Sequence, residues 1–177
     1  HRPRQIFKHV LGNDITKDEL IFEEQDETFT CGISLTSDEK NFVISTSDHI
    51  TTEEHFFSAN EPKIKLKLFQ KREKDVRYSI DSWKNHFYVH TNKNARDYKI
   101  LRCKNNNIKN LEEFIPSKKE TVIGDLEFLD DYIIVRTRFF DKKNILYETA
   151  ATDIFTSMIE VKKLVREIKN IFSTNFN

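Results

Sequence analysis

Short runs rich in β-branched and aromatic residues alternate with polar, turn-forming runs along most of the chain. Ten such runs predict strands, at residues 20–24, 41–46, 53–59, 64–70, 77–81, 86–91, 97–103, 112–116, 131–140 and 144–148. Alternation is clearest over residues 64–68, where lysines separate apolar side chains, so that one face is expected to be buried. Short strands with turns between them indicate an all-β fold.

Apolar residues at equivalent places in these strands recur 45 positions apart. The sets are Phe42, Phe87 and Tyr132; Phe56, Leu101 and Leu146; Ile21, Leu66 and Leu111; and Leu35 with Ile80, which Leu126 follows one residue out of phase. A period of about 40 to 50 residues with four short strands per unit is typical of β-propeller blades. The alternative is an ordinary β-sandwich in which the spacing is coincidental.

The stretch from His9 to Phe29 is rich in acidic residues, which raises the question of a catalytic carboxylate pair or a metal loop. The equivalent segments one and two periods later, residues 70–78 and 116–126, carry lysine or arginine instead, which a catalytic pair would not tolerate. A calcium loop needs oxygen ligands at fixed steps and a glycine at its sharp turn, and this stretch has no such frame. The acidic stretch is therefore predicted to be a solvated connection between strands.

Candidate nucleophiles and metal ligands do not form recognisable motifs. Gly32-Ile33-Ser34 lacks the second glycine of a nucleophile elbow, because Thr36 stands in its place. Cys31 and Cys103 are expected to be reduced, buried thiols, rather than a disulfide or a zinc pair. The pairs His86 with His90 and His49 with His55 lack a third ligand, so structural histidines are the preferred interpretation. We therefore predict no catalytic, cofactor-binding or metal-binding residues and no cofactor.

Charge and hydropathy limit the classes of protein to which this chain can belong. Lys plus Arg and Asp plus Glu both number 29 in 177 residues, so no net charge favours nucleic acid or an anionic membrane. No apolar run approaches the roughly 18 residues of a membrane-spanning helix, and the first residues lack a secretory apolar region. The expected location is the cytoplasm.

The C-terminal part of the sequence changes to a helical period. Beyond residue 151 the apolar stripe consists of Met158, Val161, Val165, Ile168 and Phe172, and Ser157 with Glu160 forms a capping box. An amphipathic helix is predicted over 151–177. It could cover the open face of the last strand unit, form a homodimer contact, or dock on its own core.

Three segments of the sequence, residues 7–13, 47–62 and 91–101, resemble the prolyl oligopeptidase family of serine peptidases, and within it the oligopeptidase B (protease II) group. Phe7, His9, Leu11 and Gly12 fit the family's Tyr-x-His-x-Leu-Gly-Thr run, with Asn13 in place of the threonine. Thr91, Asn92, Ala95, Tyr98 and Leu101 fit a second family pattern, and residues 47–62 resemble a third segment. The resemblance runs from about Arg2 to Val135.

The resemblance implies a partial seven-bladed-type β-propeller of about three blades. The implied layout is a propeller part over 1–150, with the end of one blade followed by blades at about 17–60, 62–104 and 108–150. The helix predicted over 151–177 departs from this resemblance, because it has no match in the oligopeptidase B pattern. The resemblance also implies a noncatalytic role, in which the propeller shields and gates an α/β-hydrolase domain that cleaves short peptides after Lys or Arg.

The partners implied are that peptidase domain, in the parent protein or in a separate chain, and oligopeptides. A homodimer through the helix or the open blade faces is a further possibility, whereas nucleic acid and membrane are not expected. The alternative is a free-standing module that binds peptides or protein.

Overall fold

A computed structural model describes residues 2–140 and 146–151 of the chain, which form β-strands and one 3₁₀ helix, Ile15–Lys17. The strands are β1 (Gln5–Lys8), β2 (Glu19–Glu23), β3 (Thr30–Leu35), β4 (Asn41–Ser47), β5 (Thr52–Ser58), β6 (Lys67–Gln70), β7 (Tyr78–Trp83), β8 (His86–Thr91), β9 (Lys99–Lys104), β10 (Glu112–Ile115), β11 (Thr121–Phe128), β12 (Ile133–Phe140) and β13 (Leu146–Ala151). The predicted all-β fold is confirmed. The predicted helix lies, from residue 152 onward, outside the described residues.

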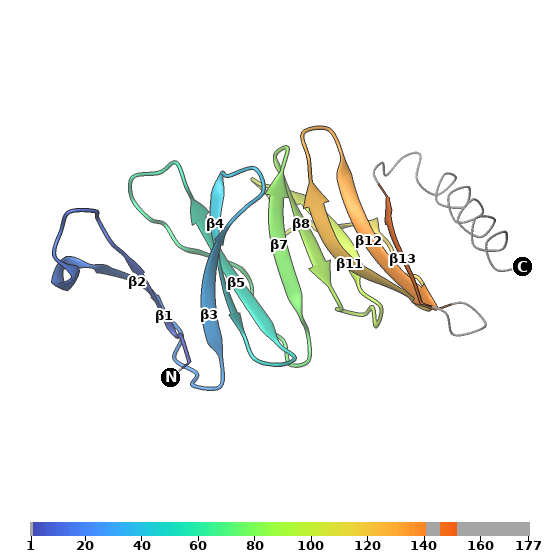
Figure 1. Cartoon of the computed structure of the whole chain (residues 1–177), viewed down its shortest axis with the longest axis horizontal. Helices are drawn as coiled ribbons and strands as arrows, with labels where there is room; N and C mark the ends of the chain where they lie inside the picture. The colour runs from blue at the N-terminus through green and yellow to red at the C-terminus, as the bar shows by residue number, and fades with distance from the viewer. Residues whose placement is uncertain (1, 141–145, 152–177) are drawn as a thin grey trace, which may run out of the picture. The chain divides into compact units, whose positions relative to one another are not determined.

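Each strand pairs antiparallel with the next strand in the chain within four sheets. The sheets are β1-β2, β3-β4-β5-β6, β7-β8-β9-β10 and β11-β12-β13. The chain forms two compact units, residues 1–117 with the first three sheets and residues 118–177 with the last. Figure 1 shows the β1–β2 hairpin in dark blue beside β3, with β7 and β8 in green.

The 45-residue period places equivalent residues in equivalent strands. Phe42 and Phe87 are each the second residue of the second strand of a four-stranded sheet, and Tyr132 immediately precedes β12. Phe56, in β5, and Leu101, in β9, lie in third strands. The spacing of the sequence therefore reflects a repeated four-strand unit.

The limits of these units differ from the predicted ranges 17–60, 62–104 and 108–150 by one strand. Those ranges begin with β2, β6 and β10, whereas the structure pairs each of these strands with the strand before it. The β6 strand, for example, pairs with β5 through Leu68 and His55. The period fixes the spacing between units but not which strand opens each unit, because a repeat can be divided at any point.

The core of the first unit lies between the β3–β6 and β7–β10 sheets. Its buried members are Val43, Phe56, Phe69, Tyr78, Ile80, Phe87, Val89 and Cys103. Alternation along each strand sends these side chains to one face. The ring of Phe87 lies 4.9 Å from that of Phe56 and 5.5 Å from that of Phe69, in edge-to-face geometry. Burial of each aromatic side chain contributes roughly 1.5 to 3 kcal/mol, so this layer holds the two sheets together.

Hydrogen bonds between side chains and backbone align the same two sheets. Ser37 donates from its backbone N–H and its hydroxyl to the two carboxylate oxygens of Asp81, at 2.7 and 2.6 Å. Ser82 in turn donates its hydroxyl to Asp38 at 2.6 Å. The β3–β4 turn and the end of β7 are thus joined by reciprocal bonds, which fix their alignment where apolar packing alone is not directional.

A charged cluster attaches the β1–β2 hairpin to the β3–β6 sheet. Arg72, which follows β6, contacts the carboxylate of Glu24 at 2.5 Å and that of Glu53 at 3.2 Å. Its backbone N–H donates to Glu53 at 2.8 Å, and its guanidinium carbon lies 4.1 Å from the centre of the Phe29 ring. Glu24 and Glu53 are both buried. Burial disfavours the charge on Arg72, but the bonds to both glutamates outweigh that effect and raise its pKa.

Replacing Phe87 with alanine should lower the free energy of unfolding by about 3 to 5 kcal/mol, because the ring is 1% exposed and its removal leaves a cavity between the sheets. Urea denaturation followed by tryptophan fluorescence measures the change. Phe7→Ala is the matched control, since Phe7 is 52% exposed and its loss should cost less than about 1 kcal/mol. Equal losses for the two variants would contradict the assigned core.

Replacing Arg72 with methionine should lower stability by about 2 kcal/mol, because it keeps the length of the side chain but leaves two buried carboxylates without their cation. Arg72→Lys should restore only part of the loss, since an ammonium group cannot reproduce the guanidinium fork. Lys71→Met is the control at an exposed neighbouring position. Similar unfolding midpoints for Arg72→Met and Lys71→Met would refute the bridging role.

Candidate functional site

The acidic stretch from His9 to Phe29 comprises the β1–β2 loop, strand β2 and the connection to β3. Glu24 departs from the predicted solvated connection, because it is buried and paired with Arg72. Other carboxylates of the stretch organise local turns. Asp14 accepts bonds from the backbone and hydroxyl of Thr16, and these bonds lower the pKa of Asp14. His9 and Asp18 join the two ends of the hairpin loop at 2.7 Å. These groups are therefore occupied in shaping the loop.

The histidines singled out in the sequence lie apart from one another. His86 and His90 lie in β8, where a four-residue separation amounts to about 13 Å. The ring of His90 stacks on Tyr98 at 4.5 Å. His55 lies in β5 against Phe22 at 5.1 Å, and burial lowers its pKa. Among the described residues, no group of three or more His, Cys, Asp or Glu side chains is arranged to hold a metal ion.

The candidate nucleophiles lie within strands. Cys31, in β3, and Cys103, in β9, are buried free thiols on different sheets. Burial raises the pKa of both, to about 11 for Cys103, which leaves little thiolate near neutral pH. Gly32-Ile33-Ser34 is extended strand, so Ser34 does not stand on a strand-to-helix turn.

In the described part of the chain no helix is long and apolar enough to cross a membrane.

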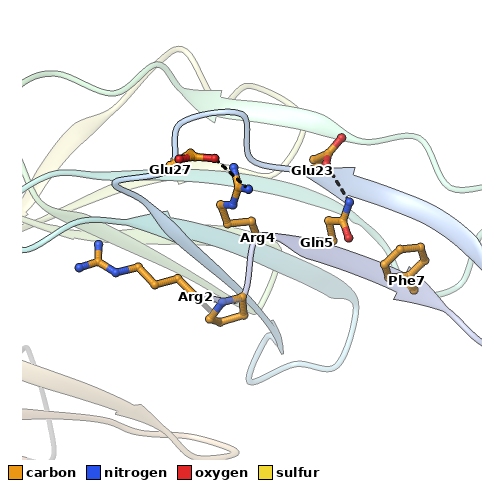
Figure 2. A pocket seen from close by; sticks show the side chains of 7 residues that line it. Arg2, Arg4, Gln5, Phe7, Glu23 and Glu27 are labelled. Carbon is orange, nitrogen blue, oxygen red and sulfur yellow. Dashed lines mark hydrogen bonds and ion pairs between the residues drawn. The ribbon is translucent and has the colours of Figure 1, made fainter.

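One hollow of the first unit lies beside β1. It has a volume of about 690 Å³ and is lined by Arg2, Pro3, Arg4, Gln5, Phe7, Glu23 and Glu27. Figure 2 shows Arg4 directed at Glu27 and Gln5 at Glu23, while Arg2 points away from both pairs. The Arg4–Glu27 distance is 3.4 Å and the Gln5–Glu23 distance is 2.7 Å. Among the described strands β1 pairs only with β2, so its other edge has no strand partner there.

A second, apolar hollow of about 320 Å³ lies between the hairpin and the β3–β6 sheet. Its lining includes Ile6, Phe7, Ile33, Phe42 and Phe57. Ile33 and Leu35, on the same face of β3, are 46% and 44% exposed. The hairpin thus covers only part of this sheet face, and what remains is apolar. Such a face suits packing against another protein segment rather than bond-breaking chemistry.

Two strands beside these hollows, β1 and β3, lie outside the ten predicted segments, and so does β11 of the second unit, although Leu35 and Leu126 belong to the 45-residue sets. The signal available for β3 is the alternation of Gly32, Ile33, Ser34 and Leu35. It is weak because a glycine and two polar residues surround only two aliphatic side chains.

Comparison with known proteins identifies this arrangement. Residues 1–158 match the family described as prolyl oligopeptidase, N-terminal β-propeller domain. Protease 2 of Moraxella lacunata is 30% identical over 137 residues, which cover 77% of this chain and 20% of that protein. Dipeptidyl aminopeptidase BI of Pseudoxanthomonas mexicana is 25% identical over 138 residues, covering 76% of this chain and 19% of that protein. The chain therefore spans about a fifth of the length of these relatives.

Solved structures show the same fold. Oligopeptidase B from Leishmania major superposes with a TM-score of 0.71 at 18% identity, covering 83% of this chain and 23% of that one. Oligopeptidase B from Trypanosoma brucei, in a closed form with covalently bound antipain, gives a TM-score of 0.71 at 21% identity over 83% of this chain and 24% of that one. The chain belongs to the prolyl oligopeptidase family of serine peptidases, and its matched residues belong to the N-terminal β-propeller domain rather than to the catalytic peptidase domain.

Proposed function

We propose that this chain supplies about three consecutive blades of a seven-bladed-type propeller in an oligopeptidase B-like serine endopeptidase. Its role is noncatalytic: it shields and gates a peptidase domain that cleaves short peptides after Lys or Arg. The family match and the similarity to Protease 2 support the family assignment. The substrate class and the gating role are carried over from the resemblance to oligopeptidase B.

The observation that carries the proposal is the stacking of sheets in residues 1–117. Two four-stranded antiparallel sheets, β3–β6 and β7–β10, pack face to face around Phe87. The β1–β2 hairpin covers part of the opposite face of the β3–β6 sheet. In a propeller every sheet is covered on both faces by its neighbours. The partly covered face at Ile33 and Leu35 therefore suits a segment of a larger closed ring.

The alternative is a free-standing module that binds peptides or protein. The unpaired edge of β1, with the hollow beside it, favours this reading, because an extended peptide can add to an open strand edge. The two functions differ in what the chain should do alone, since the module binds peptides without a peptidase domain.

The purified chain should not hydrolyse short peptides with Lys or Arg at the cleaved bond, and mass spectrometry should show no adduct with a serine-directed reagent. Hydrolysis that the reagent blocks would refute the noncatalytic role. Saturable binding of the same peptides without turnover, measured by fluorescence anisotropy, would favour the binding module.

The gating role predicts discrimination by substrate length. A chimera in which this chain replaces the matching 137 residues of Moraxella lacunata Protease 2 should cleave a short arginyl peptide far faster than an unfolded protein. A deletion of the same segment is the comparison, and it should lose the discrimination. Equal cleavage of long and short substrates by an active chimera would overturn the gating proposal.

Light scattering at several protein concentrations tests whether the uncovered apolar sheet faces associate between chains. An incomplete stack should show an apparent mass that grows with concentration, because uncovered apolar faces pair with one another. A defined dimer would instead indicate the homodimer anticipated from the sequence. A monomer at all concentrations would show that the chain covers its own apolar sheet faces, and would contradict an incomplete stack with uncovered faces.

A further inference from the structure

A buried carboxylate lies in the joint between the β3–β6 and β7–β10 sheets. Glu54, in β5, is 4% exposed. One carboxylate oxygen accepts the backbone N–H of Ile80 in β7 at 2.7 Å, and the other accepts the hydroxyl of Ser45 in β4 at 2.9 Å. The bond to Ile80 crosses from one sheet to the other, so the state of this carboxylate bears directly on the joint.

The tyrosine at the start of β7 strengthens the connection. The backbone N–H of Glu54 donates to the hydroxyl of Tyr78 at 2.9 Å, and that hydroxyl donates to the carbonyl of Gln70 at 2.5 Å. Tyr78 also exchanges two bonds with Thr52, at 2.6 and 2.7 Å. The contact region of β5 and β7 is therefore a continuous hydrogen-bonded network centred on two titratable side chains.

The groups that face the Glu54 carboxylate do not neutralise it. The β4 strand contributes the neutral Ser45, and β7 contributes Tyr78 and Asp81. In β6 the residue paired with Glu54 along the sheet is the neutral Gln70. Within the described residues, no Lys, Arg or His lies within ion-pair distance of Glu54. Glu53 next to it in β5 pairs with Arg72 at the joint with the hairpin. Burial first, and then the charge of Asp81, raise the pKa of Glu54 to about 7, against two hydrogen bonds that lower it.

Both protonation states of Glu54 can be hydrogen-bonded without rearrangement. The Ile80 N–H is a fixed donor, which either state accepts, whereas the Ser45 hydroxyl can donate to an ionised carboxylate or accept from a protonated one. The two states differ in charge, because the ionised form leaves a buried negative charge without a cation. Protonation thus removes the free-energy cost of a buried, unpaired negative charge from the joint and keeps both hydrogen bonds of the carboxyl group.

We propose that Glu54 makes the joint between the β3–β6 and β7–β10 sheets sensitive to protons near neutral pH, so that the joint is tight when Glu54 is protonated and loosens when it ionises. The loosening separates β5 from β7 at the Glu54–Ile80 bond. A propeller that admits peptides by separating neighbouring sheets would then open more readily on the alkaline side of neutrality.

The sign of the pH dependence follows from proton linkage. The folded chain holds the Glu54 proton up to about pH 7, whereas the unfolded chain releases it near 4.5, so the folded state binds more protons between these values. The contribution of Glu54 to stability is therefore fully present below pH 4.5 and is lost as the pH rises through 7. From pH 6 to pH 8 the opening equilibrium of the joint should increase about ten-fold.

Two measurements on the full 177-residue chain test this directly. Carbon-13 NMR of the glutamate side-chain carboxyls should show one resonance, assigned to Glu54 through its backbone, with a midpoint near pH 7. Hydrogen exchange of the Ile80 amide, corrected for the intrinsic rate at each pH, should become about ten-fold faster relative to amides of β1 and β2 between pH 6 and pH 8. A Glu54 midpoint below pH 5, or unchanged relative exchange at Ile80, would overturn the proposal.

Variants separate the joint from general charge effects. Glu54→Gln keeps an acceptor for Ile80 and a donor for Ser45 without a titratable charge, so the pH dependence of Ile80 exchange should disappear. Glu61→Gln removes the same charge at an exposed site, and that pH dependence should persist. A Glu54→Gln variant that retains the wild-type profile would refute the assignment. If that variant fails to fold, the titration of the wild-type carboxyl decides the question alone.

Discussion

The structure of the first unit depends on the apolar layer between the β3–β6 and β7–β10 sheets. An antiparallel sheet whose strands alternate strictly can leave one face in water, but here both faces of the β3–β6 sheet carry apolar side chains. Phe56 and Val43 face the β7–β10 sheet, while Phe57 and Ile33 lie toward the hairpin. A sheet that is apolar on both faces needs a partner on each, so the sequence of the β3–β6 sheet requires a neighbour on either side. Stacking of repeated sheets, rather than one closed core, follows from this requirement.

Apolar contact alone would let such sheets slide, and polar groups at the two ends of the joint prevent that. The reciprocal bonds of Ser37 with Asp81 and of Ser82 with Asp38 align the β3–β4 turn with the end of β7 at one end of the joint. Toward the other end, Thr52 exchanges bonds with Tyr78. Each bond adds only about 1 kcal/mol net, yet together they select one alignment among many of similar apolar area. Packing supplies the free energy here, and the hydrogen bonds supply the register.

The sequence predicted the features that repeat and missed those that depend on distant residues. The positions of Phe42 and Phe87 in equivalent strands follow from periodicity, since each repeat is a local four-strand unit. The assignment of β6 to the preceding sheet could not be obtained in this way, because it depends on pairing across the long connection after β5. The charged bridge from Arg72 to Glu24 joins residues 48 apart in the chain, and its spacing carries no periodic signal. Local pattern therefore predicted ten of the thirteen described strands, whereas the joints between sheets required the tertiary structure.

The two joints of the first unit differ in how they handle buried negative charge. Glu24 and Glu53 share the guanidinium of Arg72, so both carboxylates at the hairpin joint have a cation at contact distance. Glu54 occupies the next joint with hydroxyl and amide donors only. The proton sensitivity proposed for Glu54 therefore concerns the second joint. Because Glu53 and Glu54 are adjacent in β5, alternation directs them to opposite faces, and one strand carries an arginine-paired carboxylate on one side and a carboxylate without a cation on the other. The difference between the two joints thus follows from the placement of a single arginine.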